Sequence, residues 1–202
     1  NWGLIHLKNS YINNQTGIPF FIDYETAIPG QTVQIPIILG DSTVPADSIY
    51  GIAFSINYDE TLTDSNSVYV DFNTSWLGTN NTDLINIQKD FYTQGKIDVG
   101  VVRTDQVNRS GIGQIGSFNL TIKDDILKSN TQRLDLLISD VRIITNAETE
   151  RVAATPPTDI LISIASDLNP LVYKDIRVNM FPNPVKDQLF IQSNDAIQTI
   201  EL

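Results

Sequence analysis

The sequence contains no cysteine and only one histidine in 202 residues. The absence of cysteine excludes disulfide bonds, thiolate nucleophiles and cysteine–zinc sites. A serine–histidine catalytic pair would have to use His6, which lies within the first few residues. We therefore expect a protein that is not an enzyme, with no catalytic residues, no cofactor and no metal ligands.

Basic residues are also scarce, because 13 Lys and Arg face 24 Asp and Glu, which gives a net charge of −11. Nucleic acids and anionic membranes both attract positive charge, so neither is an expected partner. Long apolar runs are missing as well, and none approaches the roughly 20 residues of a membrane-spanning helix. These features predict no nucleic-acid binding and no membrane insertion.

Strand-forming residues dominate the composition. Ile, Val and Thr supply 28, 13 and 18 residues, whereas Ala, the best helix former, supplies only 8. Branched side chains fit the half-buried surface of a sheet and lose rotamer freedom in helices. The 19 Asp and 18 Asn residues are typical of turns, where their short side chains bond the local backbone. The composition predicts an all-β fold.

The hydrophobic pattern predicts nine or ten strands between residues 18 and 166. Residues 50–58 alternate most clearly, with large apolar side chains on one face and Gly51, Ala53, Ser55 and Asn57 on the other. This pattern indicates a central antiparallel strand whose small residues face another layer or edge. Pro36 lies inside an apolar run at 32–39 and predicts an edge strand or a bulge there. Regular strands separated by polar turns favour a sandwich or a barrel.

Composition shifts divide the chain into four segments. Residues 1–17 are expected to be a linker or the end of a preceding module, and residues 18–166 the β-sandwich. Residues 167–178 are expected to be a second linker before a short β-rich tail at 179–202. So few residues cannot form an independent core, so the tail is expected to be part of a domain or to pack on the sandwich.

Four stretches of the predicted sandwich follow one another in a characteristic order: GQTVQIPI at 30–37, YGIAFSINYD at 50–59, GKI at 95–97 and GQIGSF at 113–118. Their order and spacing resemble the cohesin-like domain, a jelly-roll β-sandwich of about nine antiparallel strands related to certain carbohydrate-binding modules. Cohesins of cellulosomes bind dockerins through one sheet face. The resemblance therefore implies a binding module.

The tail carries the segment MFPNPVKDQLFI at 180–191, in which Phe181, Pro182, Asn183 and Pro184 form a turn before a strand. This segment resembles the start of the C-terminal sorting domain of the type IX secretion system in Bacteroidetes. Further strands of that domain are missing, so only part of it is expected here. The resemblance implies secretion across the outer membrane and a place outside the cell or on its surface.

Three motifs suggest other chemistry. The glycines at 111, 113 and 116 form a G-x-G-x-x-G pattern, but a strand pattern follows where a nucleotide site needs a helix, which favours turn glycines. The acid pairs 59/60 and 124/125 lie at strand ends and are expected to be solvated rather than catalytic. Asp64, Asn66 and Asp71 lack the spacing of an EF-hand, and an irregular loop site for calcium stays open as an alternative.

Trp76 and Tyr92 are the candidate ligand-binding residues, because aromatic rings stack on sugars. The alternative is that both rings pack under loops or against the core. Ser42 and Ser48 follow aspartates in one polar loop and fit the pattern of O-glycosylation in exported proteins of Bacteroidetes. Both are glycosylation candidates, since attachment requires only exposure.

Together these features predict a non-enzymatic extracellular module of a larger secreted protein that serves adhesion, scaffolding or filament building. The expected partners are another protein, neighbouring copies of the chain, or a surface glycan. The alternative is a carbohydrate-binding module attached to a polysaccharide-degrading enzyme, which would present a row of exposed aromatic residues on one sheet face.

Overall fold

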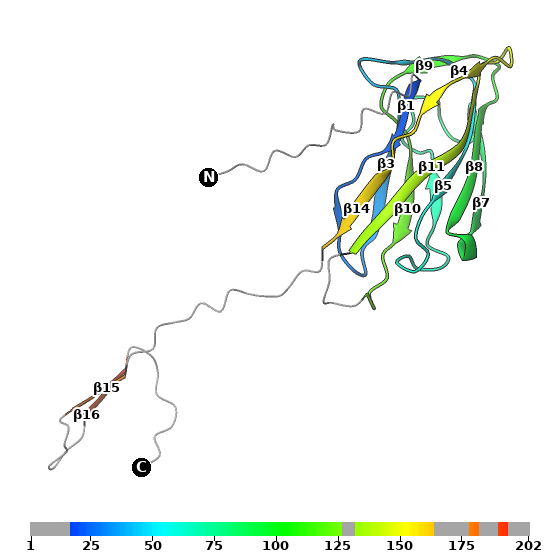
Figure 1. Cartoon of the computed structure of the whole chain (residues 1–202). Helices are drawn as coiled ribbons and strands as arrows, with labels where there is room; N and C mark the ends of the chain where they lie inside the picture. Colours follow the sequence, from blue (N-terminus) through cyan, green and yellow to red (C-terminus); the bar gives the residue numbers. More distant parts are fainter. Residues whose placement is uncertain (1–16, 127–131, 164–177, 182–189, 194–202) are drawn as a thin grey trace. The chain divides into compact units, whose positions relative to one another are not determined.

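The computed structural model describes residues 17–126, 132–163, 178–181 and 190–193 (Figure 1). The chain divides into two compact units, residues 1–164 and residues 165–202. In the second unit, β15 (Val178–Phe181) pairs with β16 (Phe190–Ser193) in antiparallel fashion. The first unit contains two large sheets.

The first sheet has five strands, in the order β13-β1-β3-β10-β6. Their bounds are Ala153–Ala154 for β13, Ile18–Ile22 for β1, Thr32–Leu39 for β3, Gln114–Thr121 for β10 and Tyr69–Asp71 for β6. β3 and β10 form its centre and pair in antiparallel fashion along their whole length.

The second sheet has seven strands, six of them in the order β2-β14-β11-β5-β8-β7, with β12 (Glu150–Arg151) paired to β11. The bounds are Thr26–Ala27 for β2, Thr158–Ile162 for β14, Gln132–Ile144 for β11, Gly51–Asn57 for β5, Lys96–Arg103 for β8 and Leu84–Phe91 for β7. The 3₁₀ turn η1 (Tyr92–Gln94) connects β7 to β8, and β4 (Ala46–Ile49) pairs with β9 (Arg109–Gly111) beside the sheets. Figure 1 shows β11, β5, β8 and β7 side by side in one layer.

Alternating side chains from both sheets form one apolar core. In β3, every second residue from Val33 to Leu39 is buried, and the opposite residues are more exposed. β8 follows the same rule with Ile97, Val99 and Val101. Branched and aromatic side chains on the inward face of each sheet therefore supply the apolar surface that holds the layers together. The prediction of an all-β sandwich is confirmed.

The strand expected at 50–58 is central, as predicted. β5 lies between β11 and β8 and pairs with both. Phe54 and Ile56 are buried, and the Phe54 ring meets the Phe20 ring of the other sheet edge-on with 5.1 Å between centroids. The small residues of β5 lie on the opposite, outer face.

The edge-strand expectation for Pro36 is wrong, because β3 is an interior strand between β1 and β10, whereas the β3–β10 ladder does have a register shift close by, between Gln114 and Gly116. The ladder between β1 and β3 ends at the pair Ile22–Ile37, and the Asp23 N–H then bonds the Pro36 carbonyl at 3.1 Å. In an antiparallel strand, the N–H and C=O of one residue point to the same side. The donor that Pro36 lacks is therefore on the side of β1, whose ladder ends at this point, and the ladder between β3 and β10 loses no bond.

The glycine motif at 111–116 lies where β9 ends and β10 begins. Because a strand rather than a helix follows the turn, no helix N-terminus is present there to hold a phosphate. The interpretation as turn glycines holds for Gly113 alone, which has a positive φ of 92° between the strands, whereas Gly111 ends β9 and Gly116 lies within β10.

Candidate functional site

The outer face of the seven-stranded sheet contains an apolar trough. Its floor consists of short side chains on β5 and β8, chiefly Gly51, Ala53 and Gly100, with Val102 opposite Gly51. Alternation along β5 gives the inward face to Ile52, Phe54 and Ile56 and leaves these small residues outside. Because the floor has no long side chains, it lies below the side chains of the flanking strands β7 and β11.

The walls of the trough come from the two flanking strands. Ile85 and Ile87 of β7 stand on one side and are 56% and 77% exposed, while Arg142 and Ile144 of β11 stand on the other. The enclosed space is about 520 Å³. Neither isoleucine is covered by another part of the described chain, although branched apolar side chains are usually buried. An apolar hollow of this kind on a sheet face is a candidate binding surface.

The width of the trough follows from the strand order. β7 and β11 are separated by β8 and β5, and three spacings of about 4.8 Å place the two wall strands about 14 Å apart. An α-helix with side chains is about 10–12 Å across. The trough therefore matches the cross-section of one helix lying along the strands.

A polar cluster adjoins the trough on the same face. Ser55 of β5 donates a hydrogen bond to Asp98 of β8 at 2.7 Å, and the Lys96 ammonium lies 3.1 Å from Asp98 and 3.5 Å from Asp140. The Ser55 hydroxyl and then Lys96 hold the pKa of Asp98 below its usual range. Asp140 belongs to an irregularity in β11, where the register with β5 shifts between Ser139 and Arg142. One end of the face is thus apolar and the other carries fixed charges.

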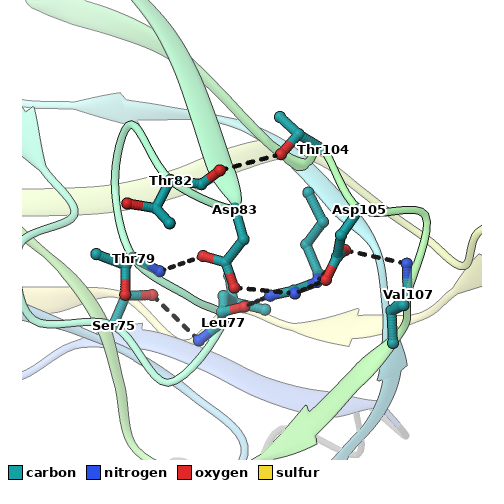
Figure 2. A network of polar contacts seen from close by, with 9 residues as sticks. Ser75, Leu77, Thr79, Thr82, Asp83, Thr104, Asp105 and Val107 are labelled. Carbon is teal, nitrogen blue, oxygen red and sulfur yellow. Dashed lines mark hydrogen bonds and ion pairs between the residues drawn. The ribbon is translucent and has the colours of Figure 1, made fainter.

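A buried ion network holds the loop that leads into the β7 wall. The Arg103 side chain is fully buried and reaches Asp83 at 3.1 Å, Asp105, and the Leu77 carbonyl oxygen. The Asp83 and Asp105 side chains labelled in Figure 2 both accept hydrogen bonds from the Arg103 guanidinium. We call Arg103, Asp83 and Asp105 the latch. Gly78 approaches it so closely that a Cβ atom there would lie 2.7 Å from the guanidinium, so any side chain would displace the loop.

The latch connects directly to the trough. Asp83 precedes Leu84, the first residue of β7, and the Asp83 carbonyl accepts the Thr104 N–H at 3.0 Å. Two residues into β7, Asn86 donates to Asn80 of the same loop at 2.9 Å. The position of the β7 wall therefore depends on the contacts of Arg103.

The aromatic candidates Trp76 and Tyr92 lie apart in the structure and make contacts within the chain. The Trp76 indole donates to the Gly113 carbonyl at 3.2 Å and covers Gly111, where a Cβ atom would lie 2.6 Å from the ring. The Tyr92 hydroxyl lies 2.9 Å from the carbonyl oxygens of two loop residues and its ring packs against the core. These contacts favour the packing alternative, and ligand binding by either residue stays a prediction.

The loop serines differ in their surroundings. Ser42 is exposed at a turn in which the Asp41 carboxylate accepts the N–H groups of Thr43 and Val44. Ser48 is half-buried in β4 and donates to Asp47 at 3.1 Å. Glycosylation stays a prediction for both, and exposure favours Ser42.

Other predicted positions involve no assembled site. Phe181 ends β15, while Pro182, Asn183 and Pro184 lie outside the described residues, as does His6. Asp71 accepts hydrogen bonds from Asn119 and Gln34, at 2.9 and 3.4 Å. Across the described ranges, no group of three or more acidic or histidine residues could hold a metal ion. No helix there is long and apolar enough to cross a membrane.

Sequence reasoning did not identify the trough or the latch. The alternation of β5 indicated small residues facing a neighbour, and β8 carries Gly100 on the same outer side. The exposed pair Ile85 and Ile87 was the further signal, because both occupy the face of β7 opposite to the buried Leu84. Arg103 also continues the inward series of β8 after Val101, which is an unusual position for a charged residue.

No protein-family model and no curated protein matches the sequence. Solved structures do match the sandwich. The sixth cohesin of scaffoldin B from Acetivibrio cellulolyticus, solved with a Cel5 dockerin mutant, is 18% identical with a TM-score of 0.57, and the match covers 73% of this chain and 100% of that one. The sandwich has the fold of a cohesin module.

Two further structures support this conclusion. The cohesin of the Coh-OlpA–Doc918 complex from Clostridium thermocellum is 14% identical with a TM-score of 0.59, and 73% of this chain and 99% of that chain are covered. A cohesin module from the family 33 glycoside hydrolase of Clostridium perfringens is 11% identical with a TM-score of 0.54, and 73% and 97% are covered. At these identities the likeness establishes the cohesin fold, which confirms the resemblance noted at 30–118.

Proposed function

We propose that this chain is a non-enzymatic protein-binding module that receives a helix of a dockerin-like partner in the trough. The observation that carries the proposal is the arrangement of the outer face, where glycine and alanine form the floor and exposed isoleucines form a wall. Covering such a surface removes apolar area from water, which is the main source of affinity in protein association.

The geometry favours a helix over a strand. β5 and β8 are each paired on both sides, so their backbone groups are used within the sheet and cannot receive an additional strand. A partner on this face must bind through its side chains, and an amphipathic helix lays an apolar stripe into a groove in this way. The cohesins of two matched structures were solved in complexes with dockerins, which supports a protein partner of this class.

The chemistry of the trough favours a protein over a glycan. Within the described chain, its side chains are aliphatic apart from Arg142 and Asn86, and none of them is aromatic. Sugar rings need flat aromatic surfaces and polar groups, whereas apolar side chains of a helix fit an aliphatic hollow. The acidic polar cluster and the net charge of −11 also favour a partner with basic residues at one end of the helix.

We expect that filling or charging the trough abolishes binding without unfolding the sandwich. Gly100→Gln places a long side chain on the floor, where a Cβ atom meets only Ile87, at 3.4 Å, and Ile87→Asp charges the wall. Binders would be selected against the natural chain from a displayed library of dockerin modules, and their affinities measured by calorimetry. Each substitution is expected to weaken the selected binders at least about a hundredfold, the effect of removing a central contact.

Ile112→Asp provides the matched control, because Ile112 is 52% exposed and lies between β9 and β10, away from the trough. It should leave affinity unchanged. If selected modules bound Gly100→Gln as tightly as the natural chain, the trough would not be the site. If the library yielded no binder at all, the dockerin class of partner would be wrong.

We further propose that the protein is secreted and acts outside the cell, with residues 179–202 as part of a type IX sorting domain. The sequence at 180–191 supports this proposal, and the antiparallel pairing of β15 with β16 agrees with a β-rich segment there. In a Bacteroidetes host, removing the chain from Val178 onward is expected to retain the protein inside the outer membrane. Secretion of the shortened protein to the medium at the normal level would exclude this role.

A further inference from the structure

The side-chain amide of Gln88, an exposed residue, bridges the edges of the two sheets. Its Oε1 atom accepts the Val70 N–H at 2.6 Å, and its Nε2 atom donates to the Val70 carbonyl at 2.8 Å. Gln88 belongs to β7, the last strand of the seven-stranded sheet, and Val70 belongs to β6, the last strand of the five-stranded sheet. One amide therefore satisfies both backbone groups of a residue in the other sheet.

These two backbone groups are the ones that a further strand would use. β6 pairs with β10 through residues 69–71, and in an antiparallel ladder alternate residues direct their N–H and C=O to opposite sides. Because Val70 bonds Gln88, its groups point away from β10. An incoming antiparallel strand would accept a hydrogen bond from the Val70 N–H and donate one to the Val70 carbonyl. The Gln88 amide thus takes the place of one residue of a neighbouring strand.

An exposed strand edge invites pairing with another chain, and proteins protect such edges with charges, bulges or covering groups. We propose that Gln88 is an edge plug, which keeps the five-stranded sheet from adding the β6 edge of a second copy. Two β6 edges fit each other in antiparallel register about Val70, with Tyr69 opposite Asp71 of the other copy. Such a contact is two-fold and closed, so its product is a dimer. This inference does not depend on the proposed function of the trough.

Gln88→Leu tests the plug, because leucine has a similar size but neither accepts nor donates a hydrogen bond. Hydrogen exchange of the Val70 amide would be measured by NMR at low and high protein concentration, with light scattering on the same samples at physiological salt. At low concentration we expect Val70 to exchange about tenfold faster than in the natural chain, the effect of losing one hydrogen bond. At high concentration we expect the mass to double and Val70 exchange to slow again.

Two further variants test whether changes in exchange and in mass are specific to the β6 edge. Gln94→Leu adds the same side chain at an exposed position of η1 and should stay monomeric with unchanged Val70 exchange. Gln88→Glu keeps an acceptor for the Val70 N–H but loses the donor to the Val70 carbonyl and places a charge at the edge, so Val70 exchange near that of the natural chain and no dimers are expected. Amide protons of β3, which is paired on both sides, report whether each variant remains folded.

Several results would overturn the inference. Unchanged Val70 exchange in Gln88→Leu would mean that the amide does not protect this edge. A variant that exchanges faster but stays monomeric at every concentration would show that the open edge accepts no second copy. If Gln94→Leu dimerised as strongly as Gln88→Leu, the association would be due to the added apolar side chain and not to the open β6 edge.

Discussion

Replacing Arg103 with methionine is expected to lower the free energy of unfolding by about 1.5–3 kcal/mol, the range for losing hydrogen bonds to charged groups, because Asp83 and Asp105 are 27% and 33% exposed. The Arg103 side chain is fully buried and binds Asp83, Asp105 and the Leu77 carbonyl. Methionine keeps much of the apolar stem but removes the cation from both carboxylates, which keep only the Thr79 and Val107 N–H groups as donors, and removes the guanidinium donor from the Leu77 carbonyl oxygen. Denaturant unfolding at neutral pH measures the loss.

The pH dependence of this loss identifies its electrostatic origin. The Thr79 N–H and then Arg103 lower the pKa of Asp83, and Arg103 is the first cause that lowers the pKa of Asp105. Carboxylates with lowered pKa values stabilise the folded chain above their unfolded pKa of about 3.9, and this contribution is lost as the pH falls through the folded values. The difference between the natural chain and Arg103→Met should therefore shrink in acid.

A matched triple variant completes the test. Arg103→Met combined with Asp83→Asn and Asp105→Asn removes the charges together with their counter-charge, and it should recover part of the lost stability because no carboxylate is left unpaired. A difference between Arg103→Met and the natural chain that stays constant from neutral to acid pH would contradict the electrostatic account. It would then assign the loss to packing of the arginine stem.

The regular strands could be predicted from the sequence, whereas the contacts of the latch could not. Strands with strict alternation, such as β5 and β8, were predictable because each residue's face depends only on its position in a period of two. The same period placed Arg103 on the inward face, yet its partners Asp83 and Asp105 lie outside the ladder of β8, in a loop and a turn. Their meeting depends on how the chain between β6 and β7 folds back, for which no local pattern exists.

The trough was predictable only in part for a related reason. Its floor can be read from Gly51, Ala53 and Gly100, but its walls come from β7 and β11, which lie about 50 residues apart in sequence. Strand order brings them to either side of β5 and β8, and strand order depends on long-range pairing. The position of Trp76 could not be predicted at all, because nothing in its local sequence indicates that Gly111 leaves space for its ring.

Phe54→Ala is expected to lower the free energy of unfolding by about 3–5 kcal/mol, as large-to-small substitutions of buried aromatic residues do. Phe54 is 2% exposed and lies at the centre of β5, and its ring contacts Phe20 of the opposite sheet edge-on. Alanine removes this contact between the layers and leaves a cavity that strands paired on both sides cannot close. Guanidinium unfolding followed by tryptophan fluorescence measures the change.

Phe54→Leu is the control for this prediction, because it keeps most of the apolar volume and should cost about 1.5 kcal/mol or less. The comparison also bears on the trough, since Ala53 and Ser55 lie on the outer face of the same strand. If core packing at Phe54 holds β5 in place, partner affinity should fall in Phe54→Ala and stay near its natural value in Phe54→Leu. A stability loss below about 1 kcal/mol in Phe54→Ala would show that this ring does not help to hold the two sheets together.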